Sequence, residues 1–176
     1  MNTALLVAVL LLTVLTVFNL VVVLGVVRRL RAYETRLGDL AEPPPVSTAT
    51  LGEPVADFAA STQDGRLVDR ASLTGRTLVG FFSPDCPACH ERLGDFRAAA
   101  DRHPGDVLAV VVNDGGDVAP VVGALGGTGG VAVVIEDPDG PVTRAFGVRG
   151  FPAFVLVGDG GVVESVGYQV PVPATL

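Results

Sequence analysis

The only two cysteines of the chain lie in one short motif, Cys86-Pro87-Ala88-Cys89. In disulfide exchange the thiolate, and not the thiol, attacks a sulfur atom. If Cys86 opens a helix, the free N–H groups of the first turn and the helix dipole stabilise its thiolate. Cys89 then lies one turn deeper on the same face, from where it can attack a mixed disulfide formed at Cys86. The motif therefore predicts redox catalysis, with Cys86 attacking and Cys89 resolving.

Three neighbours of the cysteines bear on this chemistry. Pro87 suits the first helical turn, because the N–H group that it lacks would have no partner there. His90 either tunes the thiolate or carries protons, or it is a solvated helix residue, and the sequence leaves these interpretations open. Asp85 opposes thiolate formation if its carboxylate is close, but we expect its side chain to cap the helix instead.

Two other uses of a cysteine pair fit this chain less well. A tetrahedral zinc site needs further ligands, and the only other soft candidates are His90, which is adjacent to Cys89, and His103. A structural disulfide between Cys86 and Cys89 closes a very small loop, which removes little entropy from the unfolded chain. We therefore predict no metal site and no cofactor.

Alternating strands and helices are expected to position the motif. An apolar run immediately before the cysteines predicts a strand buried on both faces, and apolar residues at helical spacing predict a helix after it. The same alternation continues along the chain and implies a mainly parallel sheet closed by an antiparallel hairpin. The expected elements are a hairpin around Asp64-Gly65, strands at 77–82, 107–113 and 131–137, helices at 87–103, 117–125 and 141–148, and two strands within 152–168.

Pro152 stands at the start of one of these strands, in GVRGFPAFVLV. Proline is disfavoured inside a central strand but is allowed at its first residue or with a special backbone. A cis Phe151–Pro152 bond is one such device. An ordinary trans proline at a sheet edge is the alternative.

The N-terminal part of the chain has a different composition. Residues 4–27 carry no charge, and a helix of that length spans roughly 36 Å, enough to cross a bilayer core. The stretch is too long for a cleaved signal peptide, and no cleavage site follows it. We predict an uncleaved transmembrane anchor at 4–27, a juxtamembrane helix and proline-rich linker at 28–50, and one globular domain at 51–176.

The net charge of the chain bears on the kinds of molecule that it can bind. The formal net charge is −7, and no basic stripe or interleaved aromatics accompany it, so nucleic acid is not expected as a partner. Arg28, Arg29 and Arg31 closely follow the predicted anchor. By the positive-inside rule these arginines place the globular domain in the cytoplasm.

The order strand–C-P-x-C–helix, followed by V-x-G-x-P before a strand–turn–strand, resembles the thioredoxin fold, a central mixed sheet flanked by helices. The segments LGEPVADFAASTQDGRLVDRASLTGRTLVGFFSPDCPACHERL and EDPDGPVTRAFGVRGFPAFVLV resemble redoxin-type proteins of the TlpA/ResA and MauD kind. The resemblance implies that Pro152 is a cis-proline facing the cysteines. It also implies that Phe151 offers backbone groups to a bound substrate strand.

The same resemblance implies partners and a location. Proteins of this kind act on protein thiols or disulfides, with a second redox partner that the sequence does not identify. They act mostly outside the cytoplasmic membrane. We therefore expect the domain outside the cytoplasm, against the indication of the three arginines.

Some positions depart from the family pattern. Many relatives of thioredoxin have a buried acid where this chain has Gly80, and ResA-like proteins have a glutamate where it has Arg92, with Glu91 one position away. Proton transfer to and from Cys89 is thus unexplained by the resemblance. After Tyr168 too few residues remain for the last helix of the fold, which is expected to be missing or very short.

Three functions are compatible with these features. The first is a membrane-tethered thiol–disulfide oxidoreductase acting on protein substrates through the CPAC motif. The second is a peroxiredoxin-like thiol peroxidase, for which Ser83 has the required spacing from Cys86, but Val79 stands where that class needs a proline. The third is a non-catalytic thioredoxin-fold adaptor that binds a partner at Phe151. The intact cysteine pair favours the first.

Overall fold

The computed structural model describes residues 3, 5, 7–17, 19–20, 46–126 and 130–171. The chain forms two compact units, Met1–Pro44 and Pro45–Leu176. In the first unit, residues 7–17 are helical. Among the described residues no helix has the length and apolar character needed to cross a membrane. Much of the predicted anchor, including residues 21–27, and the predicted helix after it lie outside the described residues.

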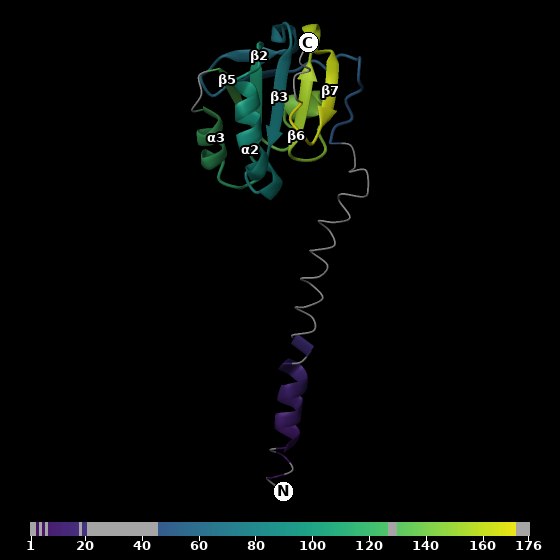
Figure 1. The fold of residues 1–176 in the computed structure, drawn as a ribbon, viewed down its shortest axis with the longest axis vertical. Helices are drawn as coiled ribbons and strands as arrows, with labels where there is room; N and C mark the ends of the chain where they lie inside the picture. The colour runs from purple at the N-terminus through teal and green to yellow at the C-terminus, as the bar shows by residue number, and fades with distance from the viewer. Residues whose placement is uncertain are drawn as a thin grey trace. The chain divides into compact units, whose positions relative to one another are not determined.

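A five-stranded mixed sheet forms the centre of the second unit (Figure 1). Its strand order is β5-β4-β3-β6-β7. The first three strands in sequence are parallel to one another, and β6 and β7 form an antiparallel hairpin beside β3. This confirms the predicted mixed sheet. The strands are β3 Thr77–Phe82, β4 Val107–Val112, β5 Val131–Glu136, β6 Ala153–Val157 and β7 Val163–Gly167.

One face of the sheet packs against two helices, α2 Pro87–Ala100 and α3 Ala119–Gly126. Three buried rings dominate this core: the centroid of Phe82 lies 5.2 Å from that of Phe96 and 5.8 Å from that of Phe154. Gly80 lies against the Phe82 and Phe96 rings. A Cβ atom at Gly80 would lie 2.6 Å from the Phe96 ring and 2.9 Å from the Phe82 ring, so only glycine fits there.

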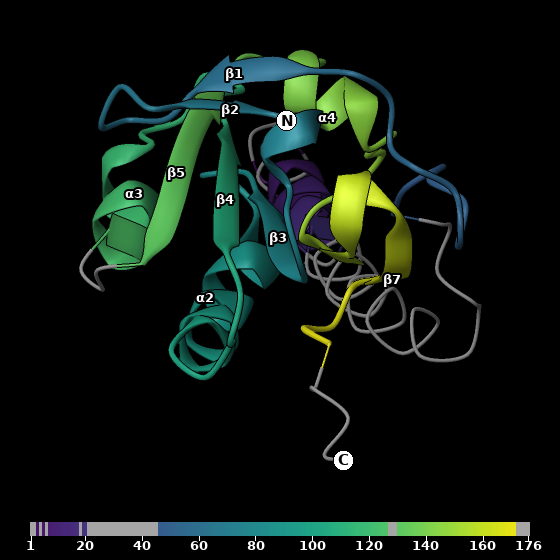
Figure 2. The same ribbon diagram turned by 90° about the horizontal axis from the view of Figure 1, so that it is seen from above.

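The other face of the sheet is covered by a small hairpin and a short helix (Figure 2). The hairpin pairs β1 Ala59–Ser61 with β2 Leu67–Asp69, around Asp64-Gly65 as predicted. The helix is α4 Pro141–Ala145. Its following residue, Phe146, is fully buried, and its ring centroid lies 5.3 Å from that of Phe81. Apolar side chains from both layers therefore enclose the sheet.

Residues 46–56, which we call the N-terminal strap, run along the surface of this unit as part of it. Ser47 forms an antiparallel bridge with Val148, and the Arg149 N–H donates to the Val46 carbonyl at 2.7 Å. Further on, the Val55 N–H donates to the Gly161 carbonyl at 3.0 Å. The compact unit thus includes residues before 51, which we assigned to a linker.

After β7, the described residues up to 171 contain no helix. The residues of β7 leave little apolar surface for a further helix to cover. On the α2 face, Gly167 stands opposite Phe154 and Ser165 opposite Leu156, so β7 adds little apolar area there. Val170 packs against the same core, and Leu156 is only 7% exposed.

Candidate active site

Cys86 stands between the end of β3 and the start of α2, as the sequence predicts. It is the N-cap residue of α2, and its Sγ accepts a hydrogen bond from the Cys89 N–H at 3.2 Å. Pro87 occupies the first helical turn, which confirms its predicted place. The expectation that Asp85 caps the helix is wrong. The Asp85 carboxylate lies instead against Gly116, where an added Cβ would come within 2.8 Å of it.

Cys89 lies behind Cys86 and is completely buried, whereas Cys86 is partly exposed. Burial raises the pKa of the Cys89 thiol far above its ordinary value, because a thiolate loses its hydration there. The hydrogen bond with Cys86 and the charges of Cys86 and Asp114 raise this pKa further, and a hydrogen bond with the Ser83 backbone opposes them. Cys89 therefore keeps its proton at neutral pH in the reduced protein.

The loop before β6 places the Phe151–Pro152 segment beside Cys86. The Phe151–Pro152 bond is cis, as the resemblance implies. Pro152 is buried and Phe151 is partly exposed. The Cys86 thiol donates to the Phe151 carbonyl, with 3.6 Å between Sγ and oxygen. The accessible cysteine and the backbone that precedes Pro152 are thus in direct contact.

His90 is exposed on the first part of α2, and its role stays open. Its Nε2 lies 2.8 Å from the Pro84 carbonyl, which can only accept, so Nε2–H donates. This bond ties α2 to the loop that leads into Cys86. Among the hydrogen bonds of the described residues, none joins the His90 ring to a cysteine.

One pair of side chains near the cysteines escaped the sequence analysis. The Ser83 hydroxyl, on a residue only 3% exposed, donates to Asp114 Oδ2 at 2.7 Å. Spacing from Cys86 is the only sequence feature that points to Ser83, and no motif points to Asp114. A signal was present, because Asp114 follows the strand parallel to and beside β3, and the carboxyl ends of parallel strands meet at one edge.

Within the described ranges, no three His, Cys, Asp or Glu side chains are grouped so that they could hold a metal ion. The Nε2 atom of His103, the other candidate zinc ligand, lies 2.9 Å from the Arg76 carbonyl oxygen.

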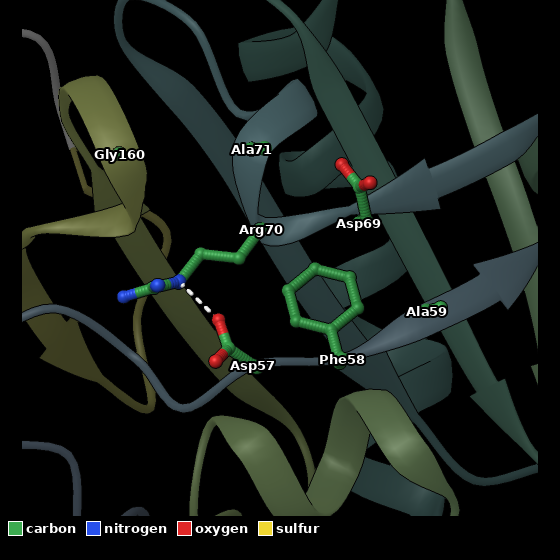
Figure 3. Close-up of a pocket in the computed structure, with 7 residues that line it drawn as sticks. All are labelled: Asp57, Phe58, Ala59, Asp69, Arg70, Ala71 and Gly160. Atoms are coloured by element: carbon green, nitrogen blue, oxygen red, sulfur yellow. Dashed lines mark ion pairs between the residues drawn. The ribbon is translucent and has the colours of Figure 1, made fainter.

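A pocket of about 470 Å³ lies apart from the cysteines, between the β1–β2 hairpin and the turn at Gly160 (Figure 3). Arg70 Nε and Asp57 Oδ1 form an ion pair of 2.7 Å beside it. The Asp57 side chain is 86% exposed, and exposed ion pairs contribute little stability. Neither cysteine lines this pocket. The pocket is therefore separate from the predicted redox site.

The fold and the cysteine pair define a class: thioredoxin-like α/β proteins with a central mixed sheet flanked by helices. Residues 50–174 match the Redoxin family, and the chain belongs to that family. Comparison with curated proteins gives no match.

Solved structures show the same fold. StoA from Bacillus subtilis is 20% identical, with 69% of this chain and 92% of that chain covered and a TM-score of 0.54. A thio-disulfide isomerase from Thermus thermophilus is 20% identical, with 70% and 89% covered and a TM-score of 0.56. An exposed lipoprotein thioredoxin from Streptococcus pneumoniae is 23% identical, with 66% and 92% covered and a TM-score of 0.52.

Proposed function

We propose that this Redoxin-family protein is a membrane-tethered thiol–disulfide oxidoreductase that acts on protein substrates through Cys86 and Cys89. One observation carries the proposal. The partly exposed Cys86 Sγ lies 3.2 Å from the Cys89 N–H at the start of α2 and 3.6 Å from the Phe151 carbonyl, with the buried Cys89 behind it. An attacking sulfur, a resolving sulfur and a backbone docking point thus meet in one place. The enzyme class also agrees with the Redoxin family.

The chemistry begins at Cys86. The Cys89 N–H donates to its Sγ, and this sulfur lies at the N-terminal end of α2, where the helix dipole attracts negative charge. The thiolate attacks one sulfur of a substrate disulfide, a mixed disulfide forms at Cys86, and the other substrate sulfur leaves as a thiolate. Cys89 then loses its proton and attacks Cys86, and the second substrate thiol is released. The substrate gains two electrons, and the cysteine pair becomes a disulfide. The reverse sequence oxidises a substrate dithiol.

Phe151 is the proposed docking point for the substrate backbone. In the reduced state its carbonyl accepts the Cys86 S–H. When Cys86 has lost its proton or carries a substrate sulfur, that donor is gone. The Phe151 carbonyl is then free to accept an N–H from an extended substrate segment, as in strand addition. Substrate binding and the state of Cys86 are coupled in this way.

The TlpA/ResA/MauD subtype is part of this proposal and rests on the sequence. The CPAC motif, the segment around it and Pro152 support it. The packing around Gly80 explains one departure from thioredoxin, because the Phe82 and Phe96 rings leave no room for an acid there. The peroxidase alternative is weakened by the structure, since the Ser83 hydroxyl donates to Asp114 and not to the Cys86 sulfur.

An exchange assay tests the function. The reduced full-length protein should catalyse the reduction of insulin disulfides by a dithiol, and Cys86→Ser should lose this activity, because the attacking sulfur is gone. Hydrogen peroxide should be consumed no faster than by free cysteine. Rapid turnover of peroxide without exchange activity would favour the peroxidase. Exchange activity that survives Cys86→Ser would place the chemistry elsewhere.

The membrane tether is proposed for residues 4–27. In the described part of this stretch the apolar side chains are exposed, such as Leu10 at 67% and Leu12 at 63%. The hydroxyls of Thr13 and Thr16 donate to backbone carbonyls of their own helix at 2.8 and 2.7 Å, which satisfies them without water. Both features suit a lipid environment.

We propose that the domain lies outside the cytoplasm. A reporter enzyme that is active only outside the cytoplasm, fused after Leu176, should be active in cells. Activity only from the matching cytoplasmic reporter would contradict this orientation and would support the indication of Arg28, Arg29 and Arg31.

A further inference from the structure

The four residues that join β3 to α2 form a tight turn that ends on Cys86. The Cys86 N–H donates to the Ser83 carbonyl at 3.3 Å, and Pro84 and Asp85 are the two central residues. Proline is favoured at the first central position, because its ring already fixes the φ angle that the turn needs. The conformation of this turn therefore determines how the chain enters the residue whose sulfur reacts.

The peptide unit between Pro84 and Asp85 decides which type of turn forms. Types I and II differ by a rotation of this unit through about half a circle, and type II needs a positive φ at the second central residue. In the described part of the chain Asp139 is the one non-glycine residue with a positive φ, so Asp85 does not adopt a type II turn. Aspartate tolerates a positive φ better than most residues. Residue type alone thus does not prevent the rotated form.

His90 holds this peptide unit in its observed orientation. The Nε2–H group of the ring donates to the Pro84 carbonyl, with 2.8 Å between nitrogen and oxygen. Rotation of the unit would turn this carbonyl away from the ring and break the bond. The backbone N–H of His90 also donates to the Cys86 carbonyl at 3.3 Å, so His90 stands on the helical turn that Cys86 opens. The ring therefore fastens the turn to the helix that carries both cysteines.

The place of the Cys86 sulfur depends on the backbone that this bond holds. Cys86 has an extended backbone, with φ −92° and ψ 108°, and caps α2. Its Sγ lies 3.2 Å from the Cys89 N–H and 3.6 Å from the Phe151 carbonyl oxygen. Without the His90 bond, Cys86 follows a turn with two accessible forms. Its sulfur is then aligned with Cys89 for a smaller part of the time.

We propose that His90 is a positioning residue for resolution of the mixed disulfide, because its ring holds the turn that aligns the Cys86 sulfur with the Cys89 sulfur. The inference rests on the proposed roles of the two cysteines. In this step Cys89 bonds to Cys86, and the bond between Cys86 and the substrate sulfur breaks, its electron pair leaving with the substrate. His90 exchanges no proton or electron. Its effect is on an internal reaction, whose rate depends strongly on alignment.

His103 offers a matched comparison at the other end of β3. Its Nε2 lies 2.9 Å from the Arg76 carbonyl oxygen, so this ring is also bonded to the main chain beside the strand. Arg76 directly precedes β3, whereas Pro84 lies beyond the end of that strand from which the cysteines follow. Replacement of either histidine by phenylalanine keeps a ring and removes the donor. The two variants should lose similar amounts of stability, and only the variant at residue 90 should change the cysteine chemistry.

The two steps of exchange can be separated with a neutral dipyridyl disulfide, which releases an absorbing thiopyridone. With the reduced full-length protein in mild detergent, the first release should depend on reagent concentration, because it reports attack by Cys86. The second release should be independent of reagent concentration, because it reports attack by Cys89 on the mixed disulfide. Cys89→Ser should abolish only the second release. A first release that survives in Cys86→Ser would refute the proposed function, whatever the histidine variants do.

His90→Phe should slow the second release by about 3- to 10-fold, the scale of one lost hydrogen bond, and should leave the first release within about twofold. His90→Gln should restore the second release, since its amide nitrogen is as many bonds from Cα as Nε2 is and carries no charge. His103→Phe should change neither release. An unchanged second release in His90→Phe, an equal loss in His103→Phe or no recovery in His90→Gln would overturn the proposal. A change confined to the first release would also overturn it, because a charge effect and not alignment would then be responsible.

Discussion

Replacing Cys89 by serine should convert the enzyme into a trap that holds substrate proteins on Cys86. The second sulfur is then absent, so the mixed disulfide has no internal partner and waits for a thiol from solution. Well-oriented internal groups reach effective concentrations of about 10⁵ M or more, which millimolar thiols cannot match. We therefore expect turnover in the insulin assay to fall by about 100-fold or more. Substrate proteins should appear as covalent adducts on non-reducing gels and disappear when a reductant is added.

Cys86→Ser provides the matched control, because it keeps the buried thiol and removes the accessible one. It should form no adduct, since Cys89 is completely buried and protonated at neutral pH. The double replacement should behave in the same way. Adducts on Cys86→Ser, or ordinary turnover by Cys89→Ser, would show that the assignment of the two roles is wrong.

Gly80→Asp, the replacement that restores the buried acid of thioredoxin relatives, should strongly destabilise this domain. The new side chain must enter a space where an ideal Cβ already lies 2.6 Å from Phe96 and 2.9 Å from Phe82. It would also bury a carboxylate among aromatic rings, with a cost of several kcal/mol. Domains of this size are stable by only about 5–15 kcal/mol. We expect a loss of about 4 kcal/mol or more in the free energy of unfolding, measured by urea denaturation followed by circular dichroism.

A pair of alanine replacements separates packing from charge. Gly80→Ala should still cost about 1–3 kcal/mol, because the added methyl group overpacks the Phe82 and Phe96 rings. Gly94→Ala, in the middle of α2, should instead stabilise the domain by up to about 1 kcal/mol, because nothing lies within 4 Å of the added Cβ and alanine favours helix. A Gly80→Asp protein as stable as the unchanged one would contradict this prediction and would show that the Phe82 and Phe96 rings can move aside at little cost.

The sheet and its helices could be predicted from the sequence because their signals are local. The apolar run at 77–82 and the helical spacing after it both have the expected structure. The contact between Cys86 and the Phe151 carbonyl joins segments far apart in the chain. The spacing of apolar residues does not predict this contact, and only the family resemblance indicates it.

Other features depend on backbone contacts that side-chain patterns do not reveal. The polar stretch around Ser47 looks like a linker, yet its main chain bonds to Val148 and its neighbours. Any sequence with free N–H and carbonyl groups could do the same. Asp114 was missed for a related reason, because its meeting with Ser83 depends on how two loops curve after their strands. The Cys86 side chain caps the N-terminus of α2, so Asp85 does not have the capping role that its residue type suggests.

The N-terminal strap has a practical consequence for anyone preparing the catalytic domain alone. A truncated version that starts at Leu51, where the composition changes, would lack the partners of the Arg149 N–H and the Gly147 carbonyl. These groups lie just before Phe151, so the cut would disturb the surface on which substrates are proposed to dock. The first residue of a shortened protein should therefore precede Val46. Otherwise a loss of activity caused by the missing strap could be attributed to the missing membrane anchor.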